Sequence, residues 1–217
     1  MTRINTKTLA KRQHGAAKPA LPARAPKGGD APVMALKLAP AKLSPAMAAF
    51  FKQSEEKLGF VPNVLQAFAF DMGKLEAFVA CRNDLMLGDS GLSRLEREMI
   101  ATAVSAQNRC FYCITVHGAS VRQLSGDPVL GEMMAMNYRA ARLSKRQRAM
   151  LDFAVKLTTE PWMIEEEDRA RLRGAGFADR DIWDIAAVAA FYNMTNRLAS
   201  AADMRPNRAY HGMAREM

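Results

Sequence analysis

The 217-residue chain has 49% hydrophobic residues, enough for a sizeable packed core, and a formal net charge of +9. Residues 1–30 hold seven of the 31 basic side chains and one of the 22 acidic ones, so the remaining chain is nearly neutral, at about +3. This distribution argues against a nucleic-acid-binding surface on the folded body. Three cysteines always leave one unpaired, which argues against a disulfide framework and favours a reducing, cytoplasmic location.

Residues 1–31 differ from the rest of the chain in composition. They are rich in Ala, Pro, Lys and Arg and contain no apolar block long enough for a secretory signal or a membrane span. We expect them to form a disordered, basic N-terminal extension. A transit peptide and a polyanion-binding arm are the two alternatives. The folded domain is expected to span residues 32–217.

From Ala39 onward, apolar residues recur at intervals of three and four, and no convincing run shows the alternation of a strand. The sequence therefore predicts an all-α fold. Gly and Pro residues mark where these helices begin or end. The expected helices span residues 45–58, 63–87, 94–106, 109–124, 128–137, 145–158, 165–174 and 180–202.

Two of these helices begin alike. Ser93 and Ser144 are expected N-caps, and Glu96 and Gln147 complete a capping box in each helix. A shift of the chain by 51 residues also pairs apolar positions of the two segments. This match indicates either an internally duplicated helical unit or the common requirements of a helix start.

The segment around residues 108–117 concentrates the reactive side chains. On a helix, Cys110, Cys113 and His117 lie within roughly 60° of one another and therefore share a face. Asn108 is the expected N-cap, which would place both cysteines near the helix start, where the helix dipole lowers the pKa of a thiol. His117 can transfer a proton near neutral pH, and Glu98 is expected to point inward from the preceding helix.

Other interpretations of this segment remain open. A zinc site would need a fourth ligand, such as Cys81 or His211, and a thioredoxin-type dithiol would need a βαβ unit that this sequence lacks. Inert burial of the cysteines is the main alternative. Cys81 is itself expected to be a buried structural thiol. The polar Asn193, Asn196 and Arg197 are expected to make packing or subunit contacts.

The spacing of Glu98, Cys110, Cys113 and His117 resembles the Glu…CxxCxxxH signature of the AhpD-like alkylhydroperoxidase and carboxymuconolactone decarboxylase superfamily. The likeness is greatest to its peroxidase-related branch. It extends over "GFVPNVLQAFA", "LSRLEREMIATAVSAQNRCFYCITVHGA", "LRGAGFADRDIWDIAAVAAFYNMTNRLA" and "RPNRAY", and so covers the chain from about residue 32 onward. It implies an AhpD-like helical bundle that assembles as a homo-oligomer.

The resemblance also implies an activity, the reduction of a small-molecule hydroperoxide by a dithiol. Cys113 would be the thiol that attacks the peroxide, Cys110 would resolve the resulting sulfenic acid, and His117 with Glu98 would relay protons. Such an enzyme needs an external dithiol reductant, whose identity the sequence does not give, and no metal or organic cofactor. No membrane association is expected.

One feature departs from the peroxidase pattern, which has a histidine between the two cysteines. Here Phe111 and Tyr112 fill that position and are expected to be core residues, so the activity would be slow or differently directed. The alternatives are a non-enzymatic redox-sensing or interaction protein that uses the same dithiol, and a lyase that acts on a lactone acid.

Overall fold

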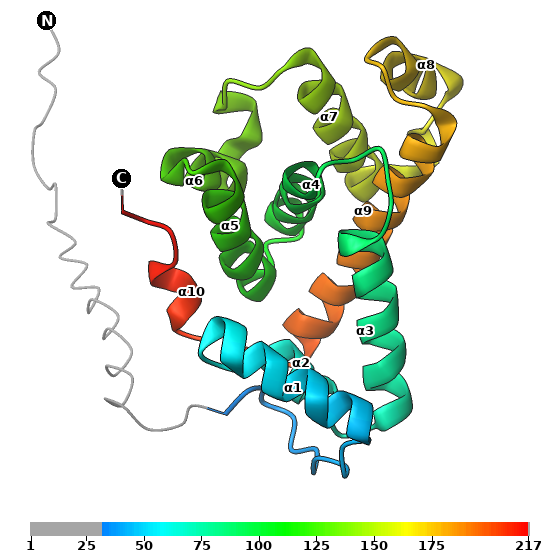
Figure 1. The fold of residues 1–217 in the computed structure, drawn as a ribbon. Helices are drawn as coiled ribbons and strands as arrows, with labels where there is room; N and C mark the ends of the chain where they lie inside the picture. The colour runs from blue at the N-terminus through cyan, green and yellow to red at the C-terminus, as the bar shows by residue number, and fades with distance from the viewer. Residues whose placement is uncertain (1–31, 217) are drawn as a thin grey trace, which may run out of the picture. The chain divides into compact units, whose positions relative to one another are not determined.

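A computed structural model describes residues 32–216 and contains only helices and loops in this range (Figure 1). The predicted all-α fold is therefore confirmed, while the expectation for residues 1–31 lies outside the described residues. Two short 3₁₀ turns, η1 and η2, lie at Tyr138–Ala140 and Pro161–Met163. The α-helices are α1 (Pro45–Leu58), α2 (Asn63–Phe68), α3 (Met72–Leu87), α4 (Arg94–Gln107), α5 (Phe111–Ser125), α6 (Pro128–Asn137), α7 (Lys145–Thr159), α8 (Glu166–Gly174), α9 (Asp179–Ala201) and α10 (Ala209–Gly212).

Most expected helices begin and end within one or two residues of the observed bounds, but the helix expected at 63–87 is wrong. It is divided into α2 and α3 by a turn at residues 69–71. The Asp71 carboxylate accepts a hydrogen bond from the backbone N–H of Lys74 and so caps the start of α3. Apolar residues continue through the turn, which is why periodicity alone did not reveal it.

Helix α4 packs against α5, α6, α7 and α9, which surround it in Figure 1. Its residues 99–105 are all buried. Because small residues such as Ala101 and Ala103 lie in this stretch, neighbouring helices can approach α4 closely on several sides. Helix α4 therefore forms a rigid base for the side chain of Glu98. No helix among the described residues is long and apolar enough to span a membrane.

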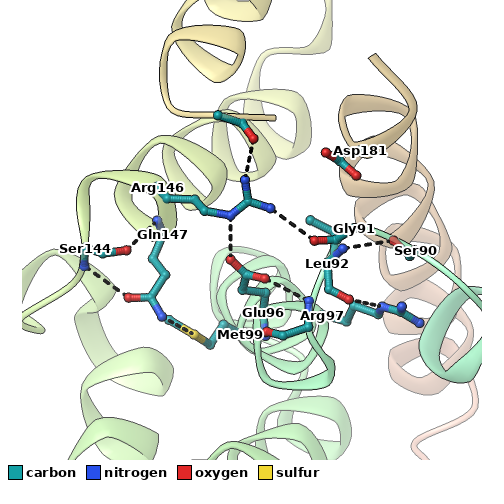
Figure 2. Close-up of polar contacts among 12 residues, drawn as sticks. Ser90, Gly91, Leu92, Glu96, Arg97, Met99, Ser144, Arg146, Gln147 and Asp181 are labelled. Atoms are coloured by element: carbon teal, nitrogen blue, oxygen red, sulfur yellow. Dashed lines mark hydrogen bonds and ion pairs between the residues drawn. The ribbon is translucent and has the colours of Figure 1, made fainter. Parts of the chain in front are cut away.

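Both predicted capping boxes are present (Figure 2). In α4, the Ser93 hydroxyl accepts from the N–H of Glu96 at 3.1 Å, and the Glu96 carboxylate accepts from the N–H of Ser93 at 2.8 Å. Ser144 and Gln147 make the same pair of bonds at the start of α7. The internal duplication stays a prediction, because matching caps arise from helix-start chemistry alone.

Arg146 links the starts of α4 and α7 to the loop before α9. Its guanidinium donates to the Glu96 carboxylate at 3.2 Å and to the carbonyls of Gly91 and Gly176 at 3.2 and 2.8 Å (Figure 2). It also lies 3.6 Å from the centre of the Phe177 ring, at cation–π distance. One side chain of α7 thus holds the first turn of α4 and the two loops before α4 and α9 together on one side of the bundle.

Candidate active site

The turn between α4 and α5 sets the position of the cysteines. The N-cap of α5 is Cys110, so the expected N-cap at Asn108 is wrong, and Asn108 instead ends α4. The chain reverses sharply because Arg109 adopts a left-handed conformation with φ of 52°, and the N–H of Cys110 donates to the carbonyl of Ser105 at 3.0 Å. This tight turn brings the start of α5 against the end of α4.

Side-chain amides attach this turn to α9. The side-chain amide of Asn108 donates to the Oδ1 atoms of Asn193 and Asn196, each at 2.9 Å. Asn196, only 1% exposed, in turn donates to the hydroxyl of Ser105 at 3.0 Å. Asn193 also binds Arg197. Asn193 and Asn196 thus make packing contacts, one of the two roles expected from the sequence, whereas Arg197 is exposed and bonds back to its own helix.

Cys110 and Cys113 lie side by side as buried thiols, 2% and 4% exposed. The Cys113 thiol, acting as a donor, lowers the pKa of Cys110 to about 6, with help from the backbone N–H of Cys113 and the hydroxyl of Ser200. The same interaction and burial raise the pKa of Cys113. The pair therefore loses its first proton easily and its second only with difficulty. The pKa of Cys110 is thus lowered chiefly by the neighbouring thiol and only secondarily by a backbone N–H of the helix start, and the pKa of Cys113, the expected attacking thiol, is raised rather than lowered.

His117 and Glu98 meet between α5 and α4. His117 Nδ1 lies 2.6 Å from Glu98 Oε2, and both side chains are 13% exposed. Since an ionised carboxylate can only accept, Nδ1 carries a proton and Nε2 is left for exchange with another group. The ring packs edge-on against Tyr192 at 4.5 Å. The structure thus brings together all four residues selected from the sequence.

An apolar cavity of about 160 Å³ opens beside Cys113 and His117, which both line it. Side chains from α1, α2, α3, α5 and α9 form its walls. Tyr112 is buried there, and its hydroxyl accepts from the N–H of Val64 at 2.9 Å, as a core residue would. Phe111, by contrast, is 57% exposed, so its expected core position is wrong.

The structure also corrects the expectation for Cys81, whose side chain is exposed. Helix α3 buries Phe78 and Val79 on its inner face, and a residue two positions after Val79 lies on a different side of the helix. The next residue, Arg82, returns to the inner side and lines the cavity. Sequence reasoning missed Arg82, although its spacing from Phe78 and Val79 was the available signal. Within residues 32–216, no three His, Cys, Asp or Glu side chains are grouped as a metal site.

Comparisons with known proteins show which families and structures the chain resembles. Residues 75–129, which contain all four selected residues, match the Carboxymuconolactone decarboxylase family. An uncharacterized peroxidase-related protein from Silicibacter sp. TM1040 is 58% identical, with a TM-score of 0.83 over 88% of this chain and 100% of its own. A second, from Ralstonia eutropha JMP134 and described as an alkylhydroperoxidase AhpD core, is 40% identical, with a TM-score of 0.83 over 86% and 99%.

More distant structures share the fold alone. The debrominase Bmp8 is 20% identical, with a TM-score of 0.67 over 78% of this chain and 90% of its own. A search of curated proteins finds no match. The Silicibacter protein, by contrast, is 58% identical over nearly the whole described range, far above the 20% identity of the debrominase. The chain therefore belongs to the carboxymuconolactone decarboxylase family and is an AhpD-like, peroxidase-related protein.

Proposed function

We propose that this protein is a thiol-dependent peroxidase that reduces small organic hydroperoxides through Cys113 and Cys110. The observation that carries the proposal is the placement of Cys113 and His117 on the wall of one apolar cavity, with the Cys110 thiol in hydrogen-bonding contact with that of Cys113. A hydroperoxide in this cavity would meet a sulfur atom and a proton donor together.

The first step needs a thiolate at the cavity wall. In the resting pair, Cys110 carries the negative charge and Cys113 the proton, and transfer of that proton to Cys110 creates the Cys113 thiolate. This sulfur attacks the terminal peroxide oxygen, so an S–O bond forms and the O–O bond breaks. His117, protonated and held by Glu98, gives its Nε2 proton to the departing alkoxide. The products are an alcohol and a sulfenic acid on Cys113.

In the second step, Cys110 converts the sulfenic acid of Cys113 into a disulfide. The Cys110 thiol attacks the sulfenic sulfur of Cys113, an S–S bond forms, and the hydroxyl leaves with the thiol proton as water. Two electrons have moved from the two thiols to one peroxide. A reduced external dithiol then restores both thiols and is itself oxidised to a disulfide. Close packing of the cysteines favours this resolution over further oxidation by a second peroxide.

The comparisons support the substrate class in this proposal. The Ralstonia relative is described as an alkylhydroperoxidase AhpD core, and the proposal extends that chemistry to the present chain. Because Phe111 and Tyr112 replace the histidine of the peroxidase pattern, His117 and Glu98 are left to supply the proton for the departing alkoxide.

A stopped-flow measurement tests the proposal. The reduced protein is mixed with cumene hydroperoxide, and peroxide loss is followed together with a thiol count. We expect each molecule of peroxide to remove two thiols, with repeated turnover when dithiothreitol is supplied. The Cys81→Ser variant should behave like the wild type, because Cys81 lies on the outer side of α3. A single slow oxidation without turnover would instead indicate a redox sensor, and unchanged peroxide would reject thiol chemistry.

A further inference from the structure

The cavity beside Cys113 has a distinct chemical character. Its walls are largely apolar and include the stacked rings of Phe68, Phe78 and Phe191. Its volume of about 160 Å³ is close to the ~150 Å³ of an apolar protein cavity that accommodates benzene. The space therefore suits an organic group about the size of one aromatic ring.

Arg82 is the one fixed cation among the described residues that line this cavity, and the lining contains no carboxylate. It is half-buried, and its guanidinium donates to the neutral amide oxygen of Asn83 at 3.0 Å. Within residues 32–216, no carboxylate lies within ion-pairing distance of it. Glu98, on the neighbouring helix, is already engaged by His117 at 2.6 Å.

The charge of Arg82 acts on the interior of the cavity. Burial and the nearby Glu98 carboxylate raise the pKa values of Tyr192 and Tyr210, and the positive charge of Arg82 opposes both increases, more strongly than Glu98 promotes the increase at Tyr210 and less strongly at Tyr192. Both tyrosines line the cavity. A cation beside apolar walls loses part of its hydration and gains from a negatively charged partner. The cavity therefore combines apolar walls, the reactive sulfur of Cys113 and a cation, Arg82, that can bind an anion.

We propose that the cavity selects molecules that carry a carboxylate on a compact apolar body, with Arg82 binding the carboxylate while the reactive group meets Cys113. Resting on the proposed function, this identifies the substrate class as the hydroperoxide of a small apolar carboxylic acid. The preference for an anion is a property of the cavity and can be measured without any peroxide.

The first test compares two reagents that differ in charge and hardly in size, iodoacetate and iodoacetamide. The Cys81→Ser/Cys110→Ser protein leaves Cys113 as its single thiol, and the rate of alkylation by each reagent is measured by mass spectrometry. Arg82→Met should lower the ratio of the iodoacetate rate to the iodoacetamide rate by roughly tenfold, the scale of a charge-assisted contact. Arg82→Lys should retain most of the ratio. Changes in thiol acidity or access affect both reagents and cancel in the ratio.

The second test measures binding directly. Isothermal titration calorimetry of the full chain with benzoate and with benzamide compares an anion and a neutral molecule of the same ring size. We expect benzoate to bind at least roughly tenfold more tightly than benzamide and to lose that advantage in Arg82→Met. Arg94→Met, an exposed position at the start of α4, serves as the matched control and should keep the advantage.

Failure of this inference is distinct from failure of the peroxidase proposal. Equal binding of benzoate and benzamide, or an alkylation ratio that Arg82→Met leaves unchanged, would overturn the anion preference even in an active peroxidase. Selective binding of benzoate that depends on Arg82, in a protein that consumes no hydroperoxide, would uphold the anion site and reject the peroxidase activity.

Discussion

The protonation state of the Cys110–Cys113 pair determines which thiol carries the negative charge. Because the Cys113 thiol lowers the pKa of Cys110 to about 6, the Cys110 thiolate is present above that pH and disappears as the pH falls through it. A titration of thiolate absorbance at 240 nm in the Cys81→Ser protein should show an inflection near pH 6. Cys113→Ala removes the main donor and should move the inflection toward the ordinary thiol value of ~8.5. An inflection already at that value with both cysteines present would contradict the expected charge sharing.

The two cysteines are expected to differ in role. Cys113→Ser should abolish peroxide turnover, since a serine hydroxyl is too weak an acid to replace the attacking thiolate. Cys110→Ser should permit one stoichiometric oxidation that stops at the sulfenic acid, which dimedone traps at Cys113. The lower pKa of Cys110 makes the opposite outcome informative. Trapping at Cys110 in the Cys113→Ser protein, and none at Cys113 in the other variant, would exchange the roles.

The contact between His117 and Glu98 should matter for the rate of the first step. His117→Gln or Glu98→Gln should slow peroxide consumption by roughly 10²-fold or more, a typical effect of losing acid–base assistance. Diamide, which needs no such assistance, should still form the Cys110–Cys113 disulfide in both variants. Glu55→Gln on the exposed side of α1 is the control. Peroxide rates equal to wild type in the Glu98 variant would exclude a role for the carboxylate.

At the scale of helices, the attachment of the α4–α5 turn to α9 depends on Asn196. Asn196→Ala would leave the amide of Asn108 and the hydroxyl of Ser105 short of partners, at a cost of about 1–3 kcal/mol in the free energy of unfolding. Urea denaturation measures this loss. Met194→Ala, exposed on the same helix, should change stability by less than about 0.5 kcal/mol. Equal effects of the two substitutions would show that the amide network contributes little.

The starts of several helices could be predicted from the sequence because their capping residues are recognisable. Ser93, Ser144 and Asp127 are capping residues followed by periodic apolar positions, so the starts of α4, α7 and α6 were readable. The left-handed turn at Arg109 carries no such signal, because glycine is the usual residue there. Cys110, Cys113 and His117 share a face through helix geometry alone. Arg82 joins them only through the packing of α3, which periodicity does not specify.

At the scale of the whole molecule, α9 leaves apolar side chains exposed. Trp183 is 72% exposed, and Met194 and Leu198 are about half exposed on the same helix. We expect a homo-oligomer that covers this face, as the sequence also predicts, since large exposed aromatic residues are typical of interfaces. Light scattering should give a mass well above the 23.9 kDa of one chain. Trp183→Glu should reduce the mass, whereas deletion of residues 1–31 should not; a monodisperse wild-type monomer would reject the expectation.

The short turn at residues 108–110 has a consequence for the order of folding. Contacts between α4 and α5 close only a small loop, so they can form early, whereas α9 packs against both helices across the long intervening segment of residues 126–178. The dithiol, its histidine and its carboxylate would thus be assembled in a nascent hairpin before any pocket encloses them. At that stage oxidants of any shape can reach both sulfurs. Selectivity among oxidants is consequently acquired late in folding, when α9 docks and encloses the thiols, the histidine and the carboxylate.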